Sequence, residues 1–204
     1  MAPGQASQRR IHDAAVRLFA ERGVVPVNVS ELATAAGVAR GTIYNNLGDP
    51  DALFGEIAGR LGNEMHERVV RSFGFVEDPA HRLANGIRFF ARRAHEEPHW
   101  GRFIVRFAFS NAALQSMWAG PPAQDLQTGV ETGRYDFPLD QLPSVVAMIA
   151  GAGLSAMFLV LEGHKTWRDA GSEAAAFVLR AIGVPVAEAR MLAHAELPPL
   201  PLLD

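Results

Sequence analysis

The chain has 204 residues, of which 49% are hydrophobic and 20% are charged, and these proportions are ordinary for a globular protein of one or two domains. It contains no cysteine, which excludes a disulfide framework and a thiolate metal or redox site and suits a reducing cytoplasm. The net charge of −3 argues against a general polyanion binder, because such proteins normally carry a large basic excess.

The N-terminal segment is expected to be a short tail followed by a helix. The sequence MAPGQASQRR has no apolar run, so no secretory signal is expected. Arg9 and Arg10 have two open interpretations, phosphate contact or a solvated helix start. From Gln8 to Arg22, apolar residues recur at the spacing of one helix face, namely Ile11, Ala14, Ala15, Leu18 and Phe19.

Two short helices joined by a glycine turn follow. Asn28 can cap the first helix, Glu31 can complete a capping box, and Gly37 can adopt the left-handed conformation that a sharp turn needs. The second helix, residues 39 to 46, is expected to point Ile43 inward, while its outward side chains carry groups that bond base edges or phosphates. The predicted DNA contacts are Asn28, Ser30, Arg40, Gly41, Thr42, Tyr44 and Asn45.

The run VSELATAAGVARGTIYNNLGDPDALF, residues 29 to 54, resembles the DNA-binding signature of TetR-type transcriptional repressors. The resemblance in detail covers about residues 8 to 60. It departs from the family pattern where Ala39 replaces a capping serine, where Asn46 and Leu47 replace a His-Phe pair, and where Pro50 replaces a lysine that commonly contacts phosphate. The resemblance implies a helix-turn-helix that binds DNA and a second half that binds small molecules.

A long connecting helix is expected after the helix-turn-helix. Asp49 can cap it, Pro50 fits its first turn, and an apolar stripe continues to about Ser72. The predicted domains are a helix-turn-helix domain at residues 1–48 and a helical ligand-binding and dimerisation domain at residues 49–204. Residues 1 to 48 hold five arginines and three acidic residues, and this modest excess predicts that two copies act together on DNA.

The string His95-Glu96-Glu97-Pro98-His99 matches the H-E-x-x-H pattern of zinc proteases. That chemistry needs both histidines on one face of a continuous helix, and Pro98 prevents this because it disfavours helix at the residue before it and lacks an N–H donor. We therefore expect a helix that ends at Glu97 and a new one that starts at Pro98. No catalytic set, metal site or cofactor is predicted.

The rest of the chain also shows helical periodicity and no alternating strand pattern, so the predicted fold class is all-α. The fold is an N-terminal three-helix helix-turn-helix domain followed by a helical bundle. The expected helices are Arg82–Ala94, Trp100–Trp118, 123–133, Leu142–Leu161, a helix capped by Ser172 over Glu173–Ile182, and Val186–Glu196.

The segment Leu142–Leu161 has 20 residues without a charge, which is enough to cross a bilayer. Its glycines, alanines and serines and its weak flanking anchors favour the alternative, a helix buried between the subunit core and a partner subunit. No membrane association is expected. The predicted homodimer interface is Val145, Ile149, Gly153, Met157, Phe177 and Val178.

Large aromatic and methionine side chains in the second half favour a partly hollow interior, although a solid core remains the alternative. The predicted ligand-binding residues are Phe89, Phe90, Phe103, Phe107, Asn111 and Met157, with His95 as a further polar candidate. The sequence thus predicts a cytoplasmic, ligand-responsive dimeric repressor that binds a palindromic double-stranded DNA operator and is released by a small, mainly apolar effector. The alternative is a small-molecule-binding or enzymatic helical bundle with a purely structural helix-turn-helix.

Overall fold

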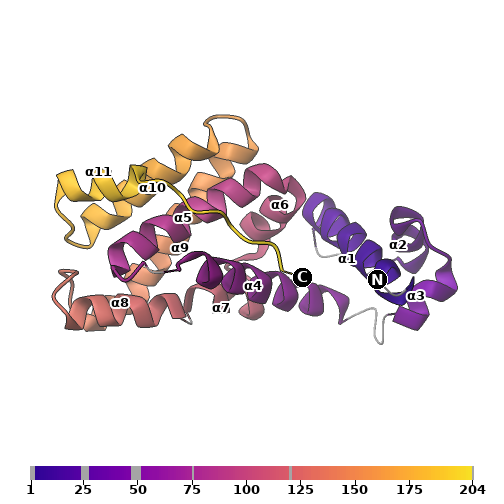
Figure 1. Cartoon of the computed structure of the whole chain (residues 1–204). Helices are drawn as coiled ribbons and strands as arrows, with labels where there is room; N and C mark the ends of the chain where they lie inside the picture. Colours follow the sequence, from indigo (N-terminus) through magenta and orange to yellow (C-terminus); the bar gives the residue numbers. More distant parts are fainter. Residues whose placement is uncertain (1–2, 24–27, 47–51, 75, 120, 204) are drawn as a thin grey trace.

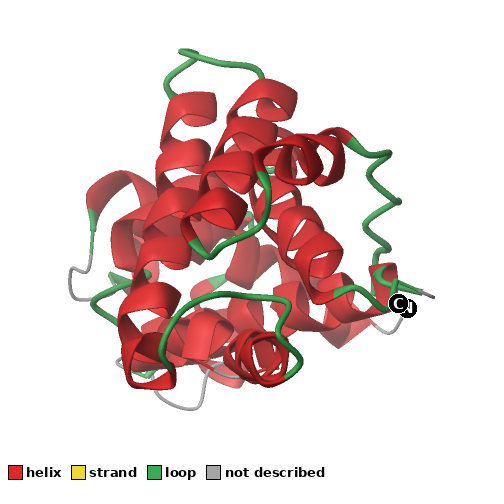
Figure 2. Ribbon diagram, turned by 90° about the vertical axis from the view of Figure 1, so that its left-hand side faces the viewer, coloured by secondary structure: helices red, strands yellow, loops and turns green. Residues whose placement is uncertain are grey.

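The structure is a computed structural model that describes residues 3–23, 28–46, 52–74, 76–119 and 121–203. Every regular element in these ranges is helical (Figures 1 and 2), which confirms the all-α prediction. A short 3₁₀ helix, η1 (Leu139–Gln141), precedes α9. The α-helices are α1 (Pro3–Arg22), α2 (Val29–Ala36), α3 (Arg40–Asn46), α4 (Leu53–Ser72), α5 (Pro79–Glu96), α6 (Pro98–Phe107), α7 (Ala112–Ala119), α8 (Pro121–Glu131), α9 (Leu142–Leu161), α10 (Trp167–Ala181) and α11 (Val186–His194).

Helices α2 and α3 form the predicted helix-turn-helix and pack on α1. The side-chain oxygen of Asn28 accepts hydrogen bonds from the backbone N–H groups of Ser30 (3.0 Å) and Glu31 (3.4 Å), so the predicted cap is confirmed. Gly37 ends α2 with φ 64° and ψ 41°, the left-handed conformation expected of it. The carboxylate of Glu31 forms an ion pair with Arg22 of α1 rather than completing the capping box.

Two helix boundaries differ from the prediction for local reasons. Helix α1 begins at Pro3, inside the expected tail, because proline suits the first turn of a helix. The single helix expected over Trp100–Trp118 is instead α6 and α7. The break occurs because the side-chain oxygen of Asn111 accepts a hydrogen bond from the backbone N–H of Leu114 (3.2 Å) and so starts a new helix.

The start of α10 and the junction between α5 and α6 test two further expectations. Helix α10 begins six residues before Glu173, at Trp167, because Thr166 Oγ1 accepts from the Asp169 N–H (3.1 Å) and caps it. The predicted cap, Ser172, is buried inside this helix. Helix α5 ends at Glu96 and α6 begins at Pro98, so the predicted break in the H-E-x-x-H string is confirmed.

Helix α4 runs from the helix-turn-helix into the bundle (Figure 1). Its first turn lies in a cluster of four phenylalanine rings, which we call the joint. The ring centroid of Phe54 is 5.2 Å from that of Phe19 in α1, and 5.5 and 4.9 Å from those of Phe103 and Phe107 in α6. The contacts of Phe54 with Phe19 and Phe107 are edge-to-face, a geometry that stabilises packing beyond simple burial. The joint therefore couples α4 to both halves of the molecule.

Buried arginines tie the middle of α4 to the junction between α5 and α6. Arg93 of α5 is 2% exposed and donates to Glu64 of α4 (2.6 Å) and to Glu97 (3.1 Å). Arg68 of α4 is also buried, and it donates to Glu97 (3.1 Å) and to the backbone oxygen of Pro201 (2.9 Å). The C-terminal segment, which crosses the bundle toward α1 in Figure 1, is thereby held against α4.

Helix α9 has the predicted bounds, and the segment Leu139–Leu161 is long and apolar enough to cross a bilayer, with a mean hydropathy of 2.2 over its most apolar stretch. In the structure α9 packs against α5, α6 and α10. Only 33% of that stretch is buried within the subunit, so α9 keeps one exposed apolar face.

His12 of α1 should make the stability of the protein depend on pH. Burial, with a smaller contribution from the Arg60 guanidinium, lowers the pKa of His12 from 6.5 to about 4. Between these values the unfolded chain binds more protons than the folded one, so stability should fall by up to about 3 kcal/mol as the pH decreases from 6.5 to 4. Thermal unfolding across this range should show a shallower pH dependence for His12→Gln; parallel curves would exclude the role of His12.

Candidate functional site

Helix α3 presents a polar face to solvent at the end of the molecule remote from the bundle (Figure 1). Ile43 is completely buried and orients the helix, whereas Arg40, Gly41, Tyr44 and Asn45 are exposed. A Cβ atom at Gly41 would meet nothing within 4 Å, so packing within the chain does not require a glycine there. The face combines the side chains that pair with base edges or phosphates with a position that a nucleic-acid backbone could approach closely.

The remaining predicted DNA contacts, Asn28, Ser30 and Thr42, also take part in hydrogen bonds within the helix-turn-helix. The oxygen of Asn28 caps α2, and the hydroxyl of Ser30 contacts the guanidinium of Arg40, which holds that side chain beside the start of α2. Thr42 is half-buried, and its backbone oxygen accepts a hydrogen bond from the side chain of Asn46 (2.7 Å).

Several positions named from the sequence lie outside the described residues. They include Leu47, Asp49 and Pro50, together with the expected domain boundary at residues 48 and 49. Ala39 directly precedes α3, which starts at Arg40.

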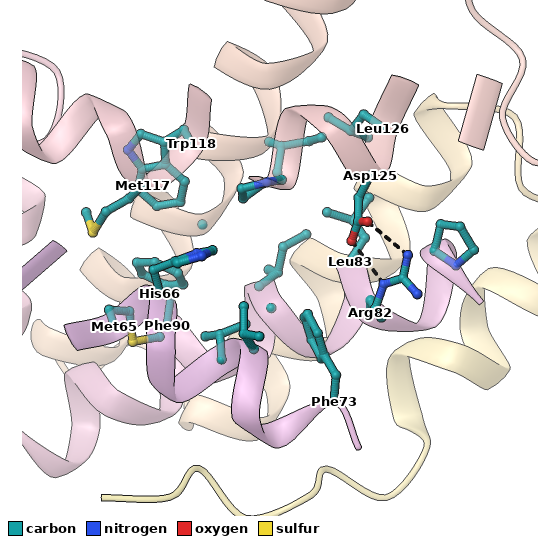
Figure 3. Close-up of a pocket in the computed structure, with 18 of the residues that line it drawn as sticks. Met65, His66, Phe73, Arg82, Leu83, Phe90, Met117, Trp118, Asp125 and Leu126 are labelled. Atoms are coloured by element: carbon teal, nitrogen blue, oxygen red, sulfur yellow. Dashed lines mark hydrogen bonds and ion pairs between the residues drawn. The ribbon is translucent and has the colours of Figure 1, made fainter. Parts of the chain in front are cut away.

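A cavity of about 290 Å³ lies among α4, α5, α7, α8 and α9. This volume is close to the lower limit of the range of ~300–1000 Å³ that is usual for small-molecule sites. Its wall is largely apolar and includes Met65 and Val69 of α4, Leu83 and Phe90 of α5, and Trp118 of α7 (Figure 3). An apolar wall with a few polar groups is the ordinary composition of a binding site for a small organic molecule.

The polar groups of the cavity wall include His66, Arg82, Asp125 and Tyr135. The Nε and Nη2 atoms of Arg82 donate to the two carboxylate oxygens of Asp125, at 3.0 and 2.9 Å. Burial, followed by the charge of Asp78, raises the pKa of the Tyr135 hydroxyl, so it stays protonated and can donate a hydrogen bond.

The ring of Tyr135 is fixed by close packing against α8. A Cβ atom at Gly129 would lie 2.2 Å from a carbon of this ring, so only glycine fits at that position. Tyr135 is also stacked on Phe137, with 6.4 Å between the ring centroids. The loop after α8 therefore forms a defined part of the cavity wall.

Of the six predicted ligand-binding residues, only Phe90 lines this cavity. The others pack elsewhere because helical periodicity identifies a buried face but not the neighbour that it meets. Asn111 caps α7, and the rings of Phe103 and Phe107 belong to the joint. Phe89 and Met157 are completely buried in the core, whereas His95 is exposed. The residues outside the cavity wall are Phe89, Phe103, Phe107, Asn111 and Met157.

The cavity residues that the sequence did not single out come mostly from the second half of α4, from α5 and from α8. His66 follows the buried Met65 in α4, and Asp125 lies next to Leu126 in α8. His66 and Asp125 each lie on a helix that carries many other polar residues, so neither stood out in the sequence. The ion pair between Arg82 and Asp125 joins residues 43 positions apart, so no local signal could have identified it.

The predicted interface residues are mostly turned into the subunit. Those buried within the subunit are Val145, Ile149, Gly153, Met157 and Val178, and two of them, Ile149 and Gly153, line the cavity. Phe177 of α10 is 63% exposed, as the prediction requires. In α9, which packs on α10, the exposed large apolar side chains are Met148 and Phe158. We call Met148, Phe158 and Phe177 the exposed α9/α10 face.

Comparisons with known proteins find the same family of regulators for both halves of the chain. Residues 11–57 match the family model described as bacterial regulatory proteins of the tetR family, and residues 78–195 match the tetracyclin repressor-like C-terminal domain. The chain is 45% identical over 53 residues to the HTH-type transcriptional regulator AcrR of Shigella flexneri. These residues make up 26% of this chain and 25% of AcrR. An uncharacterised HTH-type regulator of Mycobacterium tuberculosis is 32% identical over 89 residues, 44% of each chain.

Solved structures extend the similarity to nearly the whole chain. RolR in complex with resorcinol is 27% identical, with a TM-score of 0.71 over 97% of this chain and 98% of that one. A TetR family transcription regulator from Marinobacter aquaeolei shares the fold, with a TM-score of 0.74 and 19% identity over 87% of this chain and 96% of that one. Among the described residues, no group of three or more His, Asp or Glu side chains could hold a metal ion.

Proposed function

The chain belongs to the TetR family of transcriptional regulators, and on this premise we propose that it is a dimeric repressor whose binding to a palindromic operator is released by a small, mainly apolar effector. Members of the family bind DNA and small-molecule effectors, typically as dimers, and are normally not enzymes. The observation that carries the proposal is the combination of an exposed recognition helix with a cavity whose wall includes α4. A cytoplasmic location follows from this function.

The DNA-binding part of the proposal rests on the exposed face of α3. Arg40 can pair with a guanine edge through two donors, and Asn45 can do the same with adenine. Tyr44 is 63% exposed, and its hydroxyl can bond to a phosphate. Asn28, Ser30, Gly41 and Thr42 complete the proposed contact surface.

Substitutions in α3 should separate base contacts from phosphate contacts. Arg40→Ala is expected to cost about 1–3 kcal/mol of operator binding and to relax selectivity at one base pair, because a bidentate contact is lost. Tyr44→Phe should weaken binding to all sequences alike. Fluorescence anisotropy with operator and random duplexes measures both effects. Arg71→Ala, which removes an exposed arginine at the far end of α4, is the control and should change neither; wild-type behaviour of both α3 variants would refute the contacts.

The dimer is proposed to form through the exposed α9/α10 face. Buried apolar surface is the main source of stability in permanent interfaces, and this face offers three large side chains that are 39–63% exposed in the single chain. The two-fold axis of such a dimer would present two α3 helices to successive major grooves, about 34–36 Å apart. A palindromic operator follows from that symmetry.

Helix α4 is proposed to transmit the effector signal. Met65, His66, Val69 and Val70 of its second half line the cavity, whereas Phe54 in its first turn lies in the joint. A ligand in the cavity would favour one position of α4, and movement of its first turn would change the spacing of the two α3 helices. Because RolR binds resorcinol, that compound is the first effector to test here.

Selection of binding sites from random duplex DNA tests the proposed function. Repeated rounds with the wild-type protein should enrich a palindrome whose half-sites have their centres one helical turn, or a multiple of it, apart. The enriched sequence should bind far more tightly than random DNA, by a factor of ~10³ or more at physiological salt. If no sequence is enriched, the helix-turn-helix is structural and the alternative of a ligand-binding or enzymatic bundle is favoured.

A further inference from the structure

Among the described residues, the one guanidinium in the cavity wall, that of Arg82, already uses four of its five N–H donors. Besides its two bonds to Asp125, Arg82 donates through Nη1 to the backbone oxygens of Val76 (3.2 Å) and Glu77 (2.7 Å). A guanidinium has five N–H donors, so only one remains. Its positive charge is also neutralised by the carboxylate of Asp125. A ligand anion would therefore find no free positive partner at this end of the cavity.

The carboxylate of Asp125 keeps capacity to accept hydrogen bonds. Each of its oxygens takes one bond from Arg82, and a carboxylate offers about four lone-pair sites. A ligand hydroxyl can donate its proton in a hydrogen bond to one of the free lone pairs of the Asp125 carboxylate. A ligand carboxylate at the same place would meet like charge. The pair of Arg82 and Asp125 therefore selects an uncharged donor.

The opposite side of the cavity carries His66. Figure 3 shows its imidazole directed into the cavity, with the Arg82 and Asp125 pair toward the other side. Within the described part of the chain, neither the imidazole of His66 nor the hydroxyl of Tyr135 makes a hydrogen bond or an ion pair. A neutral imidazole offers one donor and one acceptor, which matches a hydroxyl group. Between the two polar ends the wall is formed by apolar and aromatic side chains.

We propose that the effector is an uncharged ring compound with hydroxyl groups at two ends, one bonded by His66 and the other donating to Asp125. This inference rests on the proposed function and specifies the chemistry of its effector. Since His66 belongs to α4 and Asp125 to α8, such a ligand would bridge the two helices and fix their separation. His66 is then the residue that both selects the effector and connects it to α4.

Calorimetry on the full chain without DNA tests this chemistry. The probes are resorcinol, a naphthalenediol, phenol and benzoate. The dihydroxy compounds are expected to bind at least about tenfold more tightly than phenol or benzoate, because one further hydrogen bond is worth roughly 1.4 kcal/mol. His66→Phe keeps a ring but loses the polar atoms, and it should reduce this preference about tenfold. His95→Phe makes the same change at an exposed position outside the cavity and should have no effect.

Asp125→Asn gives a second, opposite readout. This change frees the charge of Arg82, so benzoate should bind more tightly than to the wild type and the dihydroxy compounds more weakly. The inference would be overturned, with the proposed function left intact, if the wild type bound benzoate more tightly than the dihydroxy compounds or if His66→Phe had no effect. Failure of all four probes to bind would also overturn it, whereas failure of the DNA selection alone would overturn the proposed function.

Discussion

Replacing Phe158 and Phe177 together by arginine is expected to give a folded monomer that no longer binds the operator tightly. The two side chains are 48% and 63% exposed in the single chain, and in the proposed dimer they are packed between subunits. Charged groups there would be desolvated without a partner. A monomer has one recognition helix, so it loses the gain of about 10²–10⁴-fold that comes from two linked binding sites.

Sedimentation and circular dichroism together test this result. The variant should sediment as a monomer, keep the helical content of the wild type, and bind operator only at high concentration. Phe109→Arg introduces the same charge at a side chain that is 57% exposed between α6 and α7, and this control should remain dimeric. A double variant that still sediments as a dimer would place the interface on another surface.

Arg93→Met is expected to lower the free energy of unfolding by about 3–5 kcal/mol, because it removes one partner of a buried ionic network. The guanidinium is 2% exposed, donates to Glu64 and Glu97, and lies 4.4 Å above the ring of Trp100. Without it, the carboxylates of Glu64 and Glu97 share Arg68 as their ion-pair partner. The contact between α4 and the junction of α5 and α6 should weaken.

Urea unfolding of Arg92→Met provides the matched comparison. Arg92 is the preceding residue in α5, but its pair with Glu96 is partly exposed, with side chains 28% and 42% accessible. Exposed pairs contribute only about 0–1 kcal/mol, so this variant should unfold almost like the wild type. Equal loss of stability in the two variants would show that burial of the network does not determine its contribution.

The helix-turn-helix could be predicted from the sequence because its determinants are local. The side chain of Asn28 accepts from the backbone N–H groups two and three residues after it, and Gly37 turns the chain at its own position. Both signals act within four residues and need no knowledge of tertiary contacts. The inward direction of Ile43 follows equally from the short period of one helix. For the same reason Pro98 was sufficient to predict the break between α5 and α6.

The cavity could not be located from the sequence because it depends on which faces meet. Phe90 and Phe103 look alike in a pattern of apolar spacing, yet the first lines the cavity and the second packs in the joint. Asn111 was predicted as a polar ligand contact on an apolar face, but its side chain caps α7. His66 and Asp125 line the same cavity only because the tertiary packing places α4 and α8 around it.

The exposed face of α9 could not be predicted from the sequence for a different reason. Helix α9 is apolar on all sides, so its sequence does not distinguish the face that packs inward from the face left exposed. Gly153 was predicted to lie in the homodimer interface, whereas it lines the cavity and has nothing within 4 Å of the position of a Cβ atom. The packing of α5 and α10 on α9 decides which residues remain exposed.

Reciprocal coupling between effector and operator is the most direct test of a ligand-responsive repressor. Operator affinity should be titrated at constant salt with and without saturating resorcinol or the tightest ring compound, and the affinity for that compound should be measured with and without operator. We expect each ligand to weaken the other by the same factor, about 5–150-fold, which corresponds to about 1–3 kcal/mol. If the compound binds in the cavity and stabilises the protein but leaves operator affinity unchanged, the cavity is not a switch and the central claim is contradicted.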